Sequence, residues 1–111
     1  MREKEERGIK MIHTKIWVDD IRPAPDGFIE CRSVMAAKQF IEHYENEMII
    51  DVISMDHDAG SYSHMGGDYI KLLDWFEETG RDYPIHIHSK NPVGVDNMRR
   101  IIRRNGWKEV F

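Results

Sequence analysis

The 111-residue sequence has a single cysteine, Cys31, so no internal disulfide can form. Its longest apolar run is four residues long, at 34–37, whereas a helix that crosses a bilayer needs about 18 or more. The first ten residues are mostly Arg, Lys and Glu and lack the apolar core of a secretory signal. We therefore expect a cytoplasmic protein without a membrane-spanning segment.

An excess of positive charge is also lacking. Sixteen Lys and Arg face twenty Asp and Glu, which gives a formal net charge of -4 with histidine neutral. Proteins that coat duplex DNA carry an overall basic balance, because they neutralise many phosphates. That class is excluded, and any anionic ligand must be attracted by a local group of side chains.

Apolar residues are numerous enough to build a core. Hydrophobic residues make up 41% of the chain, and the aromatic residues are three Trp, four Tyr and four Phe. This content excludes a disordered chain. Residues 1–10 are predicted to be a charged, solvated arm. Residues 11–111 are predicted to form a single domain, since compact domains commonly contain about 100 to 200 residues.

Short apolar segments alternate with segments of helical periodicity. Strands are predicted at 16–18, 28–31, 49–55, 85–88 and 107–111, and helices at 34–46, 69–80 and 92–105. Such alternation implies right-handed crossovers between parallel strands. We predict a mainly parallel, five-stranded sheet with helices on both faces, which is a three-layer α/β sandwich.

The first two predicted strands are joined by a short segment that contains two prolines and a glycine, at 22–27. A parallel crossover normally takes about a dozen residues or more and usually contains a helix. Two arrangements remain open at this point. Either the segment is an extended strap between parallel strands, or the second strand pairs antiparallel.

Charged and polar side chains follow three of the predicted strands, at the edge where ligands bind in open α/β sheets. They are Asp19 and Asp20 after the first strand, Asp56, His57 and Asp58 after the third, and His86, His88 and Ser89 at the end of the fourth. Carboxylates crowded at one edge raise one another's pKa unless a cation neutralises them. We predict a divalent metal ion there, Mg²⁺ or Mn²⁺ for oxygen ligands, or Zn²⁺ if histidine takes part. The predicted metal ligands are Asp19, Asp20, Asp56 and Asp58.

Three histidines are candidates for proton transfer. His86 and His88 point to the same side of their strand, because alternate residues of a strand share a face. Each is either a hydrogen-bonded core residue or a group that binds a metal or exchanges protons near neutral pH. His57 lies between Asp56 and Asp58 in the sequence.

A phosphate-binding group is predicted at the same edge. Asn91 and Pro92 suit the start of a helix, whose free N–H groups and positive dipole end attract a phosphate beside Ser89. An ordinary helix cap is the alternative interpretation of these two residues. Arg22 follows the first acidic pair and offers a planar guanidinium to an anion. Arg22, Ser89 and Asn91 are therefore the predicted phosphate-binding residues.

The order of these residues resembles that of the response-regulator receiver fold, over residues 16–111. The resemblance implies a flavodoxin-like sandwich in which Asp19 and Asp20 bind a divalent cation. It also implies that Asp56 or Asp58 accepts a phosphate that Ser89 contacts. Two features depart from receivers. The first helix is shortened or absent, and no lysine follows the fifth predicted strand, because Lys90 lies after the fourth.

Three longer strings resemble a more particular family. Trp-Val-Asp-Asp-Ile-Arg at 17–22, Met-Asp-His-Asp at 55–58 and His-Ile-His-Ser-Lys-Asn-Pro at 86–92 are similar to a divergent receiver-like family proposed to process cyclic phosphates. The resemblance implies a metal-assisted phosphoesterase that acts on a 2′,3′-cyclic RNA end or a cyclic nucleotide. Its partner would be a phosphate-containing small molecule or an RNA end. Opening a cyclic phosphodiester needs a base and an acid, and His57, His86 and His88 are the candidates.

Two other functions stay open. In a phosphoacceptor signalling domain, Asp56 or Asp58 would be phosphorylated and the histidines would be incidental. In a non-catalytic module, the same edge would bind a nucleotide or another protein. Turnover of a cyclic phosphate separates the enzyme from both.

Overall fold

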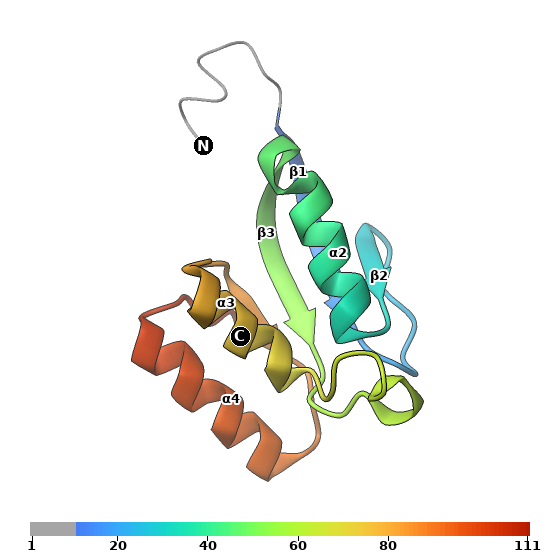
Figure 1. The fold of residues 1–111 in the computed structure, drawn as a ribbon, viewed down its shortest axis with the longest axis vertical. Helices are drawn as coiled ribbons and strands as arrows, with labels where there is room; N and C mark the ends of the chain where they lie inside the picture. Colours follow the sequence, from blue (N-terminus) through green and yellow to red (C-terminus); the bar gives the residue numbers. More distant parts are fainter. Residues whose placement is uncertain (1–10) are drawn as a thin grey trace.

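The computed structural model describes residues 11–111, and the arm predicted at 1–10 lies outside the described residues. Its main elements are β1 (Ile12–Val18), β2 (Phe28–Cys31), α2 (Val34–Tyr44), β3 (Met48–Met55), α3 (Ile70–Thr79), β4 (Ile85–Ile87) and α4 (Pro92–Asn105). Two short 3₁₀ turns lie at Glu45–Glu47 and Gly60–Tyr62. The strands form one sheet with the order β2-β1-β3-β4, and the helices pack against it (Figure 1).

All neighbouring strands of the sheet are parallel. Of the two arrangements left open for β2, the extended strap is therefore the correct one. The segment at 19–27 leads from the end of β1 back to the start of β2, and no helix is present in these described residues. This confirms that the first helix of the receiver pattern is missing.

The predicted fifth strand at 107–111 is wrong. This segment forms only an isolated bridge between Ile85 and Glu109. The N–H of Ile85 donates to Lys108 O at 2.9 Å, and its carbonyl accepts from Val110 N–H at 2.7 Å. Both bonds involve Ile85 alone, so the contact does not extend into a ladder. The sheet of the described chain therefore has four strands.

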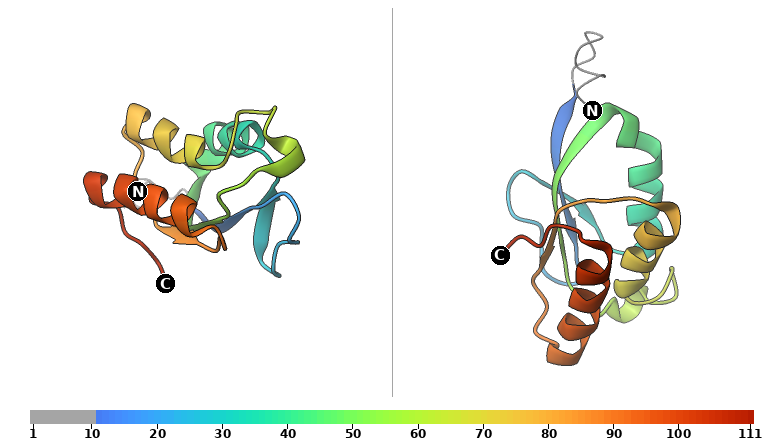
Figure 2. Two further views of the ribbon diagram at one scale, coloured as in Figure 1. Left: turned by 90° about the horizontal axis from the view of Figure 1, so that it is seen from below. Right: turned by 90° about the vertical axis from the view of Figure 1, so that its left-hand side faces the viewer.

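The three helices lie on the same side of the sheet (Figure 2). The steps from β2 to β3, from β3 to β4 and from β4 to the C-terminal segment all run in one direction across the sheet. Right-handed crossovers that run in one direction place their helices on one face. Only the step from β1 to β2 runs the other way, and it has no helix. The fold is receiver-like α/β as predicted, but the described residues form two layers instead of three.

Local signals set the helix boundaries. Ser33 Oγ accepts from Ala36 N–H at 3.0 Å and caps α2. Asn91 Oδ1 accepts from Gly94 N–H at 3.0 Å, with Pro92 at the first helical position of α4. Gly106 ends α4 in the left-handed conformation, at φ 68°. No helix among the described residues is long and apolar enough to cross a membrane.

The core lies between the helices and one face of the sheet. Its largest fully buried side chains are Ile16, Val18, Ile41, Ile53, Met55, Tyr69, Leu72, Leu73, Phe76, Ile85, Met98 and Ile102. Alternate strand residues point to the opposite face, which carries no helix in the described chain. Trp17, Ser54 and His86 are register partners in one such row. Side chains on this face contact residues of the site described below.

The single cysteine is buried in the hydrophobic core. Burial raises the pKa of the Cys31 thiol to about 11, so very little reactive thiolate forms near neutral pH. Cys31 therefore belongs to the core and gives no sign of being a nucleophile.

Phe76→Ala tests the packing of α3. The ring is fully buried and makes edge contacts with Tyr83 and Trp107, with ring centroids 5.3 and 6.3 Å apart. We expect the variant to lower the free energy of unfolding by about 3–5 kcal/mol, because it leaves a cavity in the core. Urea denaturation measures this. Glu78→Ala changes an exposed residue of the same helix and should alter stability by less than about 0.5 kcal/mol. Equal stability of the two variants would contradict this packing.

Candidate active site at the carboxyl ends of the strands

The ends of β1, β3 and β4 lie side by side at one edge of the sheet. Asp56 N–H donates to Val18 O, and His88 N–H donates to Met55 O, both at 3.0 Å. These bonds continue the parallel ladder one residue beyond each strand. As the sequence predicts, the residues that follow the three strands therefore emerge together.

Three carboxylates form a group at this edge. Asp19, Asp20 and Asp56 each offer an oxygen, and these oxygens lie within 4.8 Å of one another. Asp19 is only 1% exposed. Its Oδ1 accepts from the N–H groups of Ile21 and Arg22 at 2.9 and 3.1 Å. We call these three side chains the carboxylate group.

The pKa values of the carboxylate group reflect crowding and burial. Burial opposes the ionisation of Asp19, but hydrogen bonds from Ile21, His88 and Arg22 outweigh this effect and hold its pKa below the ordinary value. The pKa of Asp20 is raised, first by burial and then by the charges of Asp19 and Asp56. A cation beside Asp20 would relieve this repulsion.

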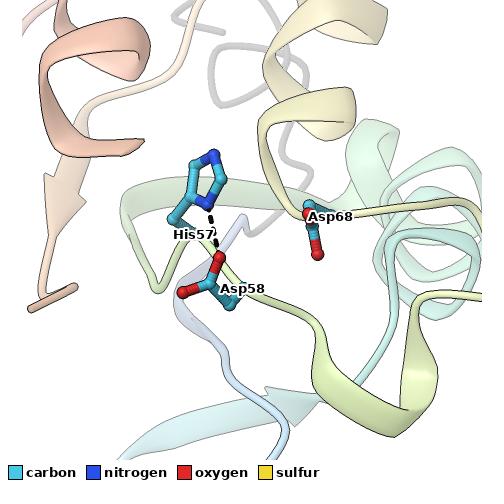
Figure 3. A group of neighbouring side chains, drawn as sticks. All are labelled: His57, Asp58 and Asp68. Atoms are coloured by element: carbon cyan, nitrogen blue, oxygen red, sulfur yellow. Dashed lines mark hydrogen bonds and ion pairs between the residues drawn. The ribbon is translucent and has the colours of Figure 1, made fainter. Parts of the chain in front are cut away.

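Asp58 belongs to a different group from Asp56. His57, Asp58 and Asp68 also bring ligand atoms within 4.8 Å of one another, on the loop that follows β3 (Figure 3). Asp58 Oδ1 lies 2.8 Å from His57 Nδ1. The sequence left the choice between Asp56 and Asp58 open, and the geometry places Asp56 with the first acidic pair.

Asp68 was not among the predicted site residues. Its Oδ1 accepts from Ala59 N–H at 3.0 Å, which draws the end of the loop back to its beginning. Gly66 and Gly67 lie just before it, both with positive φ. A glycine pair in the sequence predicts a turn. It does not indicate which residue at the start of the loop the following side chain will contact.

His57 has one ring nitrogen engaged and one free. Because a carboxylate only accepts, Nδ1–H donates to Asp58 when that carboxyl is ionised. Nε2 makes no hydrogen bond to any residue that the structure describes. The ring packs against Gly94 in the first turn of α4, where an added Cβ would lie 2.5 Å from His57 Cγ. The side chain is 15% exposed, and the contacts with Asp58 and Gly94 hold the ring in place.

His88 has both ring nitrogens engaged. Nε2 lies 2.8 Å from Asp19 Oδ2, and Nδ1 lies 2.8 Å from Ser54 Oγ. The ring is stacked on Trp17 at a centroid distance of 3.9 Å. Burial lowers the pKa of the imidazole, and its interactions with Asp19 offset only part of this effect. His88 is therefore a neutral, tightly held ring near neutral pH.

His86 faces the C-terminal segment. Its Nδ1 lies 2.9 Å from Val110 O. Within the described residues, His86 makes no hydrogen bond to the carboxylate group. The ring centroids of His86 and His88 are 6.4 Å apart. The two histidines share a face of the sheet, as predicted, but they have different partners.

The three predicted phosphate-binding residues surround the same edge. Arg22 Nη1 donates to His88 O at 2.9 Å and lies 3.7 Å from Asp19 Oδ2. Ser89 Oγ accepts from Asn91 N–H at 3.1 Å. Asn91 caps α4 and its amide approaches Asp58 at 3.4 Å. The start of α4 therefore lies next to the loop that carries His57 and Asp58.

Comparison with known families identifies the domain. Residues 14–104 match the model of the cyclic-phosphate processing receiver domain. The chain belongs to this family. No curated protein and no solved structure matches the chain significantly.

The match confirms the family that the three sequence strings predict. The match starts within β1 and ends in the last turn of α4, so it includes every predicted site residue from Asp19 to Asn91 in this cyclic-phosphate processing receiver domain. The same edge holds carboxylates, a histidine with a free nitrogen and a guanidinium. These groups are suited to binding a cation, moving a proton and holding an anion.

Gly94→Ala tests the seat of His57. Alanine is favoured over glycine within a helix by roughly 0.5–1 kcal/mol, yet the new Cβ would occupy the space of the imidazole. We expect α4 to stay folded while the ring of His57 moves, which NMR detects as altered His57 ring resonances. Asn97→Ala, at an exposed position of α4, should leave those resonances unchanged. Unaltered His57 resonances in Gly94→Ala would contradict the close packing.

Proposed function

We propose that this cyclic-phosphate processing receiver domain is a metal-assisted phosphoesterase that opens a 2′,3′-cyclic RNA end or a cyclic nucleotide. The observation that carries the proposal is the junction of the carboxylate group with His57. Asp56 belongs to the carboxylate group, and its Oδ1 accepts from the N–H of His57 at 2.7 Å. A cation and a proton-transfer group would thus act on one bound phosphate.

The carboxylate group fits a hard divalent cation. Three carboxylate oxygens from Asp19, Asp20 and Asp56 converge, and such oxygens are the ligands that Mg²⁺ and Mn²⁺ prefer. The pKa of Asp20 is raised first by burial and then by the charges of Asp19 and Asp56, and a cation would offset the second effect. When bound, the cation would stabilise negative charge that develops on the phosphate oxygens.

His57 is the residue we assign to proton transfer. Its Nε2 is free among the described residues, while Nδ1 is oriented by Asp58. Neutral Nε2 would take a proton from the attacking water, and the protonated ring would return a proton to the departing ribose oxygen. His88 is less suited to this step, because Asp19 and Ser54 engage both of its nitrogens.

Arg22 and the start of α4 are proposed to hold the phosphate. The side chain of Arg22 is 40% exposed beside Asp19, so it can bind an anion as well as the protein. Ser89 and Asn91 lie at the N-terminal end of the 14-residue helix α4, whose dipole favours negative charge. The edge at which the strands end therefore combines positive groups for the phosphate with negative groups for the cation.

Metal binding can be measured without a substrate. We expect calorimetry to detect binding of Mn²⁺ to the metal-free protein, and Asp20→Asn to weaken it by about tenfold or more, because it removes one charged ligand. Asp26→Asn, an exposed carboxyl of the strap, should retain the wild-type affinity. Absence of Mn²⁺ binding at millimolar concentration, or equal affinity of the two variants, would refute the proposed site.

Turnover should depend on His57. The assay compares an RNA oligonucleotide with a 2′,3′-cyclic end, a 2′,3′-cyclic mononucleotide and a 3′,5′-cyclic mononucleotide, each with saturating Mn²⁺. We expect His57→Ala to lower kcat on the accepted substrate by about 10²- to 10⁴-fold, which is the usual contribution of general acid–base catalysis. His64→Ala, an exposed loop histidine, is the matched control and should retain full turnover.

Two outcomes would contradict the proposed enzymatic activity. One is a folded wild-type protein that opens no cyclic phosphate with Mg²⁺, Mn²⁺ or Zn²⁺. The other is a stable gain of one phosphate from acetyl phosphate, detected by intact mass and lost in Asp56→Asn, which would favour a phosphoacceptor signalling domain.

A further inference from the structure

Ser54, His88 and Asp19 form a chain of hydrogen bonds across three neighbouring strands. Ser54 lies on β3, His88 follows β4 and Asp19 follows β1. The imidazole lies between the other two, with Nδ1 2.8 Å from Ser54 Oγ and Nε2 2.8 Å from Asp19 Oδ2. The chain lies on the face of the sheet that lacks a helix in the described residues.

This chain of hydrogen bonds is almost completely shielded from solvent. The side chain of His88 is 10% exposed, and Ser54 is 2% exposed. The imidazole stacks on Trp17 with an angle of 6° between the ring planes. Trp17 is held in turn by a hydrogen bond from Nε1 to Arg22 O at 2.9 Å. A buried serine with this little exposure cannot meet a phosphate, so the chain is not a nucleophilic triad.

The direction of the hydrogen bonds follows from the donors available. A carboxylate of Asp19 only accepts, so Nε2 of His88 carries the proton between them. In the neutral ring Nδ1 then accepts, and the hydroxyl of Ser54 donates to it. Both oxygens of Asp19 are thereby fixed, since Oδ1 already accepts from the N–H groups of Ile21 and Arg22.

We propose that Ser54 and His88 are positioning residues that hold the Asp19 carboxylate in its orientation toward Asp20 and Asp56, with Nε2–H of His88 as the donor. The importance of that orientation rests on the proposed function, in which Asp19 is a metal ligand. Hydrogen-bond partners behind a metal ligand commonly contribute 10- to 100-fold in metal affinity or activity.

The proton on His88 tests the proposal without metal or substrate. NMR of ¹⁵N-histidine-labelled, metal-free protein at pH 8, where an ordinary imidazole is neutral, distinguishes the two tautomers of each ring. We expect His88 to carry its proton on Nε2. A proton on Nδ1 would overturn the proposal, because the ring could not then donate to Asp19.

The second measurement is Mn²⁺ affinity of matched variants. Ser54→Ala removes the donor to Nδ1, and His88→Phe keeps a stacking ring without donors. Both should weaken Mn²⁺ binding by about 10- to 100-fold, whereas His88→Gln, which retains an amide donor, should restore part of the loss. Ser63→Ala, at an exposed loop position, is the control. Ser54→Ala deletes a single oxygen atom from the buried side chain, so it remains informative if His88→Phe does not fold.

The two measurements separate the proposals. Wild-type affinity in folded Ser54→Ala and His88→Phe would overturn the positioning role while leaving the metal site intact. A wild-type protein that binds no Mn²⁺ would refute the proposed function, and the tautomer of His88 would then decide the positioning role alone.

Discussion

Three parallel strands that end at the same level bring together carboxylates that repel one another, and much of the site compensates for that repulsion. The ladder contacts beyond Val18 and Met55 place Asp19 and Asp56 side by side. Asp19 is stabilised as an anion by two backbone N–H groups and by His88. Asp20 lacks equivalent support, and its pKa is raised. Asp20 is also less buried than Asp19, so a cation from solvent would approach the group from its side.

The described residues place no helix on one face of the sheet, and aromatic rings cover His88 there instead. In a three-layer sandwich, a helix would cover the face that carries Trp17, Ser54 and His86. Here the strap after β1 and the C-terminal segment lie near that face (Figure 2), and the side chains cover one another. Trp17 stacks on His88 and makes an edge contact with Phe28. Burial of His88 without a covering helix thus depends on this stack, which couples the packing of the sheet face to the geometry of Asp19.

The sequence predicts those features whose cause is local. The helix start predicted at Asn91 and Pro92 is set by a bond within a few residues, and α4 begins there in the structure. The acidic strand ends are equally visible, because strand ends meet in any parallel sheet. The failures depend on distant residues. Residues 107–111 bond to β4 only at Ile85, which depends on how two distant segments meet. The position of Asp68 beside His57 depends on how the loop after β3 closes, and no short sequence motif predicts this.

The contrast between His57 and His88 shows why residue type and spacing do not assign a chemical role. Both follow a strand of the same sheet, and both meet an aspartate at 2.8 Å. The partner of His57 is an exposed aspartate, and its second nitrogen is free among the described residues. The partner of His88 is buried, and Ser54 occupies its second nitrogen. A proton can leave the first ring for a ligand, whereas the second ring would have to break a hydrogen bond in a buried environment, which is costly. The second partner of each ring therefore separates a candidate acid–base group from a support for the carboxylate group.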